Sequence, residues 1–261
     1  MDDPARAAQR IFDDRKAGKR FAPAAGWFEG FDLAAAYAIQ DAYVALLKRE
    51  HGPAVAGYKI GLTSQRMQAL CHASEPIAGV VLASRMLESP GELRAADYIR
   101  LCIECELAVR IGADIGLDAP PLTATTVGSA IDRVAAAFEI VDDADADYAG
   151  IDGASIAADN SWNAGLLLGP SVAYDGKGLI GRRGVLYRDG VEIDQGMSED
   201  VLGDPLSVVL WLDGHLRAHG RHLRAGDWIT TGSIITTKFV KPGERYEFRL
   251  DGLEPVTLVG R

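Results

Sequence analysis

The chain has 261 residues, of which 48% are apolar and 25% are charged. This length predicts one large domain, or one domain with a small extension, and the composition is sufficient for a sizeable core. The formal net charge of −10 argues against nucleic acid or an anionic membrane as the main partner. An anionic small substrate is compatible with it, because one local cation or metal can override the overall field.

No segment approaches the ~20 consecutive apolar residues that a membrane-spanning helix requires. The start of the chain, Met-Asp-Asp-Pro-Ala-Arg, is polar and has no signal-peptide core. The three cysteines, Cys71, Cys102 and Cys105, are an odd number and indicate no disulfide framework. We therefore expect a soluble cytoplasmic protein without a membrane partner.

The first part of the chain is predicted to be helical. Residues 2–20 are charged and rich in alanine, and a clearer helix follows Asp32, which is a suitable N-cap. Apolar residues recur at helical spacing after Asp32, and His51-Gly52-Pro53 ends this helix. Beyond it, glycine becomes more frequent and short strands replace helices. We predict an N-terminal helical extension over residues 1–52 and a catalytic mixed-sheet domain over residues 53–261.

Short strands with single inserted helices are predicted for the second part. The predicted strands cover residues 55–60, 98–112, 138–141, 166–168, 171–173, 227–231, 245–250 and 254–259. The predicted helices cover residues 64–70, 126–136 and 205–218, and a hairpin over 184–193 turns at Asp189-Gly190. Because strands mostly neighbour strands, the pattern indicates an α+β fold with a mixed, barrel-like sheet.

An acidic pair, Glu104 and Glu106, lies inside an apolar run. Side chains alternate along a strand, so the two carboxylates point the same way. Carboxylates are rarely buried unless they are paired or bind a metal. Glu139, in a second apolar run, supplies a third acid, and three converging carboxylates suggest a hard divalent cation, Mg²⁺ or Mn²⁺. The alternative is that Glu104 and Glu106 line the solvated face of a half-exposed strand.

Two other patterns resemble metal sites. Cys102 and Cys105 match C-x-x-C, but an offset of three in a strand places their thiols on opposite faces, so we interpret both as structural. His215 and His219 have the i, i+4 spacing of a zinc pair, but H-E-x-x-H is absent because position 216 is leucine. We interpret these histidines as surface residues at a helix C-terminus.

Lys59 lies inside an apolar strand flanked by glycines. It is either an edge-strand lysine that aids solubility or a buried cation suited to acid–base chemistry. The following loop, residues 61–64, leads into a helix and offers N–H groups that could hold a carboxylate. A polar run with Asp159 and Asn160 is either a capped turn or an acid and an amide behind a site.

Six motifs occur in a defined order: Gly-Tyr-Lys-Ile-Gly-Leu-Thr-Ser (57–64), Ser-Glu-Pro-Ile-Ala-Gly (74–79), Glu-Cys-Glu-Leu-Ala (104–108), Phe-Glu-Ile-Val-Asp (138–142), Asp-Asn-Ser-Trp-Asn-Ala-Gly (159–165) and Tyr-Arg-Asp-Gly (187–190). In this order they resemble the 2-keto-4-pentenoate hydratases, with 2-oxo-hept-4-ene-1,7-dioate hydratase and 4-oxalocrotonate decarboxylase as close relatives. All belong to the fumarylacetoacetate hydrolase superfamily. The resemblance runs from about Leu33 to the end of the chain.

The resemblance implies a mixed β-roll or barrel core with an N-terminal helical extension, a bound Mg²⁺ or Mn²⁺, and a homo-oligomer that is a dimer or larger. Association with a related decarboxylase is a further expectation. Carried over by position, the metal ligands fall on Glu104, Glu106 and Glu139. We predict Lys59 and Asp159 as catalytic residues. The predicted substrate-binding residues are Leu62, Thr63, Ser64, Asn160 and Ser233.

The expected activity is metal-dependent hydration of a short 2-hydroxydienoate or 2-oxo-enoate in the breakdown of aromatic compounds. Two positions depart from the relatives. Ile77 stands where hydrating relatives commonly carry an acid, and residues 141–144 lack the arginine that often follows the third metal glutamate. The loss at position 77 favours two alternatives, decarboxylation of a vinylogous 2-oxo acid or C–C hydrolysis of an acylpyruvate. A hypothesis from another class is a catalytically degenerate subunit that binds 2-oxo acids or a related enzyme.

Overall fold

The larger of two β-sheets contains nine strands within residues 2–261, the part of the chain that this computed structural model describes. Its strands are β1 (Val55–Gly61), β2 (Ile77–Leu82), β3 (Met86–Glu88), β5 (Leu101–Ile111), β6 (Ile131–Asp142), β7 (Asn163–Leu168), β8 (Val172–Ala173), β11 (Trp228–Ser233) and β12 (Lys238–Phe239). The hydrogen-bonded order is β2-β1-β11-β5-β6-β7-β3, with β12 beside β5 and β8 beside β6.

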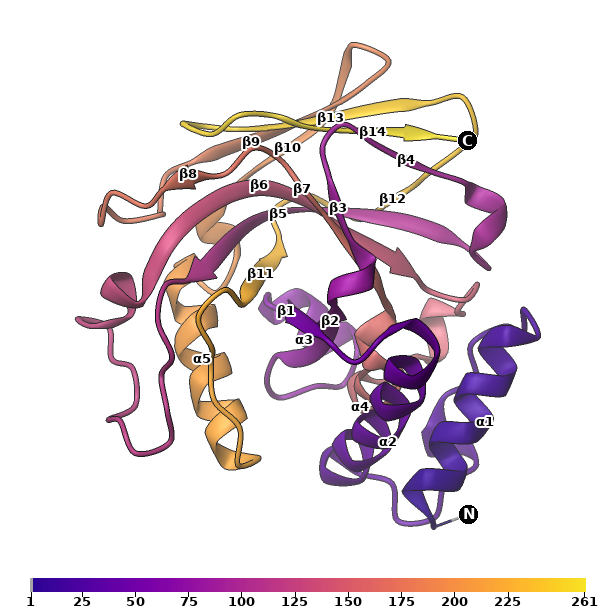
Figure 1. The fold of residues 1–261 in the computed structure, drawn as a ribbon. Coiled ribbons are helices and arrows are strands. Elements are labelled where there is room, and N and C mark those ends of the chain that lie inside the picture. Colours follow the sequence, from indigo (N-terminus) through magenta and orange to yellow (C-terminus); the bar gives the residue numbers. More distant parts are fainter. Residues whose placement is uncertain (1) are drawn as a thin grey trace.

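The smaller sheet has the order β10-β9-β13-β14-β4. Its strands are β4 (Gly91–Leu93), β9 (Arg183–Arg188), β10 (Val191–Met197), β13 (Arg245–Leu250) and β14 (Val256–Gly260). Figure 1 shows this sheet stacked on one side of β5, β6 and β7. The main hydrophobic core lies between the two sheets, where the ring centroids of Phe138 and Phe248 are 6.2 Å apart.

Five α-helices lie within residues 2–261: α1 (Pro4–Lys16), α2 (Leu33–His51), α3 (Gln65–Leu70), α4 (Gly153–Ala158) and α5 (Pro205–Ala218). Short 3₁₀ helices occur at Ala24–Gly26, Ala83–Arg85, Ala95–Asp97, Val127–Ala130, Tyr148–Gly150, Asn160–Trp162 and Ser198–Asp200. In Figure 1, α1, α2 and α4 lie on the side of β5 and β6 that faces away from the smaller sheet.

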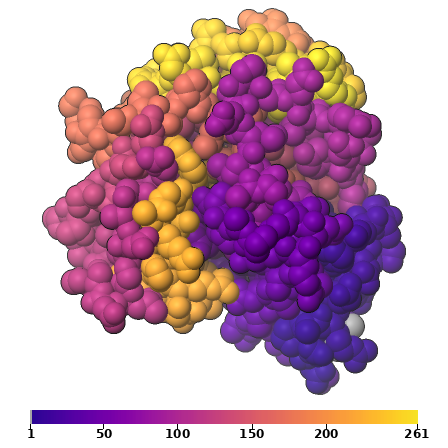
Figure 2. All heavy atoms as spheres, in the orientation of Figure 1, coloured from indigo at the N-terminus to yellow at the C-terminus, as the bar shows by residue number. Residues whose placement is uncertain are grey.

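A second apolar cluster joins the N-terminal helices to the sheet. Tyr37 and Ile39 of α2 share it with Cys102 of β5, Val141 of β6 and Trp162. Figure 2 shows the indigo N-terminal segment in direct contact with the purple segment that follows it. The predicted division of the chain at residue 52 stays a prediction.

The helix predicted for residues 126–136 is wrong. Only the 3₁₀ turn Val127–Ala130 is helical there, and β6 begins at Ile131. Residues 134–141 are all buried, because the smaller sheet covers one face of β6 and the helices cover the other. A strand buried on both faces shows no apolar–polar alternation. The alanines of β6 have a high helix propensity, which led to the prediction of a helix. Tertiary packing overrides this propensity.

Most of the predicted local signals are confirmed. Asp189 and Gly190 have φ angles of 52° and 81°, as the turn of the β9–β10 hairpin requires. Asp204 caps α5 by accepting a hydrogen bond from the Leu206 N–H at 2.9 Å. His215 differs from the prediction of a surface residue, because its ring is partly buried and stacks on Trp211 at 5.0 Å.

The predicted combination of helices with mixed sheets is confirmed, because both parallel and antiparallel strand pairs occur beside the helices. The strand order of neither sheet closes on itself within residues 2–261, and the β-roll or barrel description stays a prediction. None of the helices in this range is long and apolar enough to cross a membrane.

Candidate metal centre

Three glutamates converge on the helix-facing side of the larger sheet. In the antiparallel β5–β6 pair, Glu104 lies directly opposite Glu139, and Glu106 follows two residues along β5 on the same face. One carboxylate oxygen from each glutamate lies within 4.8 Å of the others. Glu106 and Glu139 are fully buried. The half-exposed-strand alternative, stated for Glu104 and Glu106, therefore does not hold for Glu106, whereas Glu104 is partly exposed.

The two buried glutamates are each held by one carboxylate oxygen. Glu106 Oε2 accepts a hydrogen bond from the Gly232 N–H at 2.6 Å, and Glu139 Oε1 accepts from Asn163 Nδ2 at 3.1 Å. The other oxygens, Glu106 Oε1 and Glu139 Oε2, are buried and have no hydrogen-bond partner within residues 2–261. Buried carboxylate oxygens without partners are costly unless a cation binds them.

Glu104 lies at the more open edge of the cluster and is partly exposed. Its Oε1 accepts a hydrogen bond from Thr237 Oγ1 at 2.6 Å. Three oxygen donors from carboxylates form the ligand set that hard divalent cations prefer. The residues present therefore fit such an ion.

The side chain of Lys59, in β1, lies close to the glutamate cluster. Its Nζ lies 3.3 Å from Glu139 Oε2, an ion pair that lacks the geometry of a hydrogen bond. Burial by itself would lower the pKa of Lys59, but the three glutamate charges outweigh burial and raise the pKa. Lys59 is therefore a buried ammonium, and the alternative of a solvent-exposed edge lysine is excluded.

The pKa values of the buried glutamates reflect the crowding of negative charge. Burial, followed by the charges of Glu139 and Glu104, raises the pKa of Glu106 well above its usual range. Burial also raises the pKa of Glu139 to about 7, against the opposing effect of Lys59. A bound cation would favour the ionised forms of both groups.

This crowding predicts a pH dependence of stability for the metal-free protein. The pKa of Glu139 is about 7 in the folded chain, above its unfolded value of about 4.3. The folded state therefore binds this proton more tightly, so the stability is complete at low pH and is lost as pH rises through the folded pKa. We expect the Tm of chelator-treated protein to fall between about pH 5 and pH 7 relative to a Glu139→Gln variant.

Differential scanning fluorimetry across this pH range measures the effect. Comparison with Glu139→Gln cancels the contributions of the other acids. Addition of a divalent cation should abolish the difference in slope, because the cation binds the ionised carboxylate. Identical pH profiles for the two metal-free proteins would contradict the assignment.

The loop predicted to bind substrate lies against the cluster. Leu62 has a φ of 56°, an uncommon left-handed conformation for leucine, and the Ser64 hydroxyl caps α3 by accepting from the Met67 N–H at 3.3 Å. A Cβ atom on Gly232 would lie 2.1 Å from Thr63 Oγ1. Because Gly232 has no side chain, Thr63 can pack against it. In this position the Gly232 N–H donates its hydrogen bond to Glu106. The substrate-binding roles of Leu62, Thr63 and Ser64 stay predictions.

The other predicted site residues bond to protein groups. Both carboxylate oxygens of Asp159 accept hydrogen bonds from Arg15 of α1. The Asn160 amide exchanges two hydrogen bonds with the backbone of Val80. Ser233 Oγ donates to the Ile235 carbonyl at 2.5 Å and accepts from the backbone of β5. The structure thus gives these residues a role in holding loops, and their catalytic or substrate-binding roles stay predictions.

The segment that follows Asp159 is unusually strained. Asn160, Ser161 and Trp162 have consecutive φ angles of 50°, 52° and 58°, in a region that residues other than glycine rarely adopt. The hydrogen bonds of Asp159 and Asn160 hold this segment in place. Its last turn delivers Asn163, whose amide donates to Glu139.

Three residues at or near the centre were not predicted. Asn163 lies in the polar run that the sequence singled out, so a signal for it existed. Thr237 and Arg15 carry no such signal, because a lone threonine in a loop and an arginine in an alanine-rich helix are common surface residues. Their contacts depend on segments that lie far apart in the sequence.

Arg15→Met is expected to destabilise the protein strongly. Asp159 is 4% exposed, and its carboxylate would lose its only ion-pair partner within residues 2–261. Leaving such a buried charge unpaired costs about 3–5 kcal/mol. Urea unfolding measures the change, and Arg10→Met, which removes an exposed arginine of the same helix, is the matched control. A loss no larger than that of the control would show that the ion pair is unimportant.

Comparisons with known proteins identify the family of the chain. No family model matches the chain. The 2-keto-4-pentenoate hydratase of Paraburkholderia xenovorans (strain LB400) is 31% identical over 96% of this chain and 92% of its own length. The chain belongs to the 2-keto-4-pentenoate hydratase family. A 4-oxalocrotonate decarboxylase of Pseudomonas putida, 31% identical over 80% of this chain and 79% of its own, is also related to this family.

Solved structures support the same placement. The 4-oxalocrotonate decarboxylase from Pseudomonas putida G7, in complex with magnesium and adipate, has a TM-score of 0.90 at 26% identity, covering 99% of this chain and 97% of its own. A fumarylpyruvate hydrolase from Pseudomonas aeruginosa, in complex with Mn²⁺ and pyruvate, has a TM-score of 0.61 at 16% identity, covering 78% and 88%. The latter similarity shows the fold alone.

Two positions were expected from the resemblance to depart from the relatives, and the structure shows what lies around each. Ile77 of β2 pairs with Gly61 of β1 and is buried, and a Cβ atom on Gly61 would lie 3.6 Å from Ile77 Cγ1 and 3.1 Å from Lys59 Nζ. The apolar side chain of Ile77 and the Lys59 amine therefore both lie next to Gly61.

The missing arginine after Glu139 is the second feature. Arg15 donates to the backbone oxygen of Asp142 at 2.8 Å, and Arg100 Nε donates to Asp143 at 2.7 Å. Arg15 of α1 and Arg100, the residue before β5, thus bind the turn at the end of β6. This turn therefore has arginine partners, although residues 141–144 contain no arginine.

Proposed function

We propose that the protein is a metal-dependent hydro-lyase that adds water to a short 2-hydroxydienoate or 2-oxo-enoate in the breakdown of aromatic compounds. The observation that carries the proposal is the cluster of Glu104, Glu106 and Glu139, whose oxygens lie within 4.8 Å of one another beside Lys59. Membership of a family whose relatives are named hydratases supports it.

Mg²⁺ or Mn²⁺ is the proposed cofactor, and the three glutamates would hold it. Carboxylate oxygens suit both ions. The two buried oxygens without hydrogen-bond partners, noted above for Glu106 and Glu139, support a cation between them. When bound, the cation would supply a Lewis acid for the 2-oxo group and adjacent carboxylate of the substrate.

Lys59 is the residue that we propose to hold or donate a proton at its Nζ atom. Its raised pKa keeps the ammonium protonated at neutral pH, so it can donate to a substrate oxygen or pair with a carboxylate. A central position in β1 fixes Nζ beside Glu139. The backbone N–H groups of residues 62–64 are the proposed contacts for the substrate carboxylate.

Hydration also requires a group that moves a proton to or from water. Ile77 cannot supply that group. Asp159 is the proposed alternative, and its two oxygens are engaged by Arg15. A direct role for Asp159 therefore requires this ion pair to open during turnover.

A decarboxylase of a vinylogous 2-oxo acid is the second candidate, and a C–C hydrolase of acylpyruvates is related to it. The apolar side chain of Ile77 beside Lys59 favours decarboxylation, because loss of CO₂ needs no activated water. The relationship to 4-oxalocrotonate decarboxylases supports this candidate.

A product assay separates the candidates. The protein loaded with Mg²⁺ would be given 2-hydroxypenta-2,4-dienoate and, separately, a 2-oxo-enedioate. Water addition to the first without release of CO₂ from the second supports the hydratase, and the reverse result supports the decarboxylase. Metal binding without turnover of a panel of 2-oxo acids and acylpyruvates would instead favour the degenerate, 2-oxo-acid-binding subunit.

The proposed assembly is a homo-oligomer that is a dimer or larger, with association with a related decarboxylase as a further proposal. Light scattering of the protein alone and after mixing with such a decarboxylase tests both.

A further inference from the structure

A cavity of about 340 Å³ lies beside the glutamate cluster and is separate from it. Helices α1 and α2, strand β2 and the segment before β7 form its walls, whereas Lys59 and the three glutamates do not line it. Asn163 touches both places, because it lines the cavity and donates to Glu139. The volume lies at the lower end of the range for small-molecule sites.

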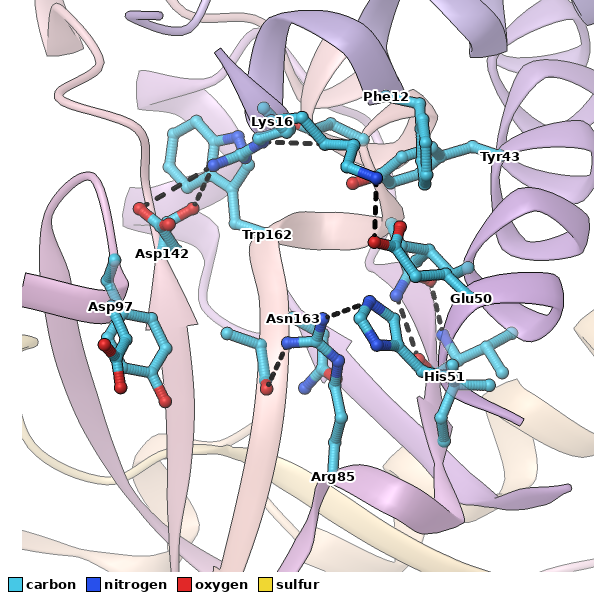
Figure 3. Close-up of a pocket in the computed structure, with 18 residues that line it drawn as sticks. Phe12, Lys16, Tyr43, Glu50, His51, Arg85, Asp97, Asp142, Trp162 and Asn163 are labelled. Atoms are coloured by element: carbon cyan, nitrogen blue, oxygen red, sulfur yellow. Dashed lines mark hydrogen bonds and ion pairs between the residues drawn. The ribbon is translucent and has the colours of Figure 1, made fainter. Parts of the chain in front are cut away.

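Arg85 lines the cavity and has no acidic partner in the described part of the chain. Within residues 2–261 it forms no ion pair with a carboxylate. Its guanidinium donates to the Ala164 carbonyl at 3.2 Å and contacts His51 Nε2 at 2.9 Å (Figure 3). Because a guanidinium only donates, Nε2 of His51 must accept. Burial and the charge of Arg85 lower the pKa of His51, which favours the neutral ring that accepts from Arg85.

The acids around the cavity are already partnered. Glu50 pairs with Lys16 at 2.8 Å, and this pair spans one side of the cavity in Figure 3. The Asp142 carboxylate accepts three backbone N–H bonds, at 3.0, 3.0 and 3.1 Å, and Asp159 is bound by an arginine. Asp97 is exposed and pairs with its neighbour Arg94. None of these acids neutralises Arg85.

Two tyrosine hydroxyls also line the cavity. Tyr43 and Tyr98 have no hydrogen-bond partner for their hydroxyls in the described part of the chain. Both hydroxyls can donate to an anion. The remaining walls are largely apolar and include Phe12, Leu47 and Trp162.

We propose that this cavity is a second ligand site, which binds a small monocarboxylate with an apolar body. The carboxylate would pair with Arg85 and accept from the tyrosine hydroxyls, and the body would contact the apolar walls. Arg15 and Lys16 pair with Asp159 and Glu50, so within residues 2–261 Arg85 is the lining cation left for a ligand. One such cation suits a single negative charge better than a dianion such as phosphate. A ring of six carbons with one carboxylate fits within the volume of the cavity.

Benzoate is the probe that matches this description, and benzamide is its uncharged control. Isothermal titration calorimetry would be done with chelator-treated protein, because no metal ion is then present to bind the benzoate carboxylate. A repeat with Mg²⁺ should leave the affinity for benzoate unchanged. We expect benzoate to bind at least about tenfold more tightly than benzamide, since a charge-assisted hydrogen bond contributes more than a neutral one.

Variants test the residues. Arg85→Met should weaken benzoate binding by about tenfold or more, and Tyr98→Phe by about two- to tenfold. Arg249→Met, which removes an exposed arginine of β13 outside the cavity, should bind like the wild type. Circular dichroism and Tm values verify folding, and Arg85→Lys, which keeps the charge, should recover part of the affinity.

Several results would overturn the site. They are no binding of benzoate to the wild type, equal binding of benzoate and benzamide, and unchanged binding to a folded Arg85→Met protein. Binding that appears only with Mg²⁺ would place benzoate at the metal centre instead. Competition by inorganic phosphate as strong as that by benzoate would overturn the choice of a monocarboxylate.

Discussion

Replacing Glu106 by glutamine is expected to abolish turnover and cation binding while leaving the metal-free protein at least as stable as the wild type. Glu106 Oε1 is buried without a hydrogen-bond partner within residues 2–261, so it is free to bind a cation. Removing a group that only contacts a metal ligand already weakens metal binding by about 10- to 100-fold. Loss of a ligand itself should therefore weaken Mg²⁺ binding by more than about a hundredfold. Turnover should fall by about a thousandfold or more, because a bound cation supplies several kcal/mol of catalysis.

The stability of the variant distinguishes a metal ligand from a structural acid. Burial and the neighbouring carboxylates raise the pKa of Glu106, so its charge opposes folding when no cation is present. A neutral glutamine removes that cost, and it can keep accepting the hydrogen bond from Gly232. Calorimetric Mg²⁺ titration, steady-state kinetics and chelator-treated Tm values measure the three effects.

Glu92→Gln is the matched control, because Glu92 is exposed and pairs with Arg261 far from the cluster. It should change neither turnover nor Mg²⁺ affinity. If Glu106→Gln keeps both metal binding and turnover, the proposed centre is wrong. If the metal-free variant is strongly destabilised, Glu106 is mainly a structural residue.

Lys59→Met is expected to remove turnover without removing the cation. Positioned acid–base groups contribute about 100- to 10,000-fold to rates, and turnover should fall within that range. Lys59 Nζ lies 3.3 Å from Glu139, so its loss makes the cluster more negative. Mg²⁺ should therefore bind as tightly as in the wild type, or more tightly.

The variant should be assayed in its Mg²⁺-loaded form, because the metal-free cluster loses its neutralising cation. Lys19→Met, which removes an exposed lysine near the end of α1, is the control and should retain full activity. Loss of Mg²⁺ binding in Lys59→Met would show that the lysine acts on the ligands rather than on the substrate. Full activity of this variant would exclude Lys59 from the chemistry.

The sequence by itself determined that two of the three carboxylates share one face of a strand. Strand alternation placed Glu104 and Glu106 on one face, and the structure confirms this placement in β5. Alternation also separated Cys102 and Cys105, which lie in different hydrophobic clusters. Local capping and turn signals at Asp32, Asp189-Gly190 and Asp204 fixed element boundaries, because these signals depend on neighbouring residues only.

Tertiary structure decided what surrounds those carboxylates. The pairing of β5 with β6 set Glu139 opposite Glu104, and no local pattern specifies such a register. The same packing made residues 131–136 a strand, because burial on both faces outweighed the helical propensity of alanine. The ion pair of Arg15 with Asp159, the apolar position of Ile77 beside Lys59 and the uncompensated charge of Arg85 arise from contacts between distant segments. Charge compensation depends on distances in space, and a sequence encodes these only through the fold.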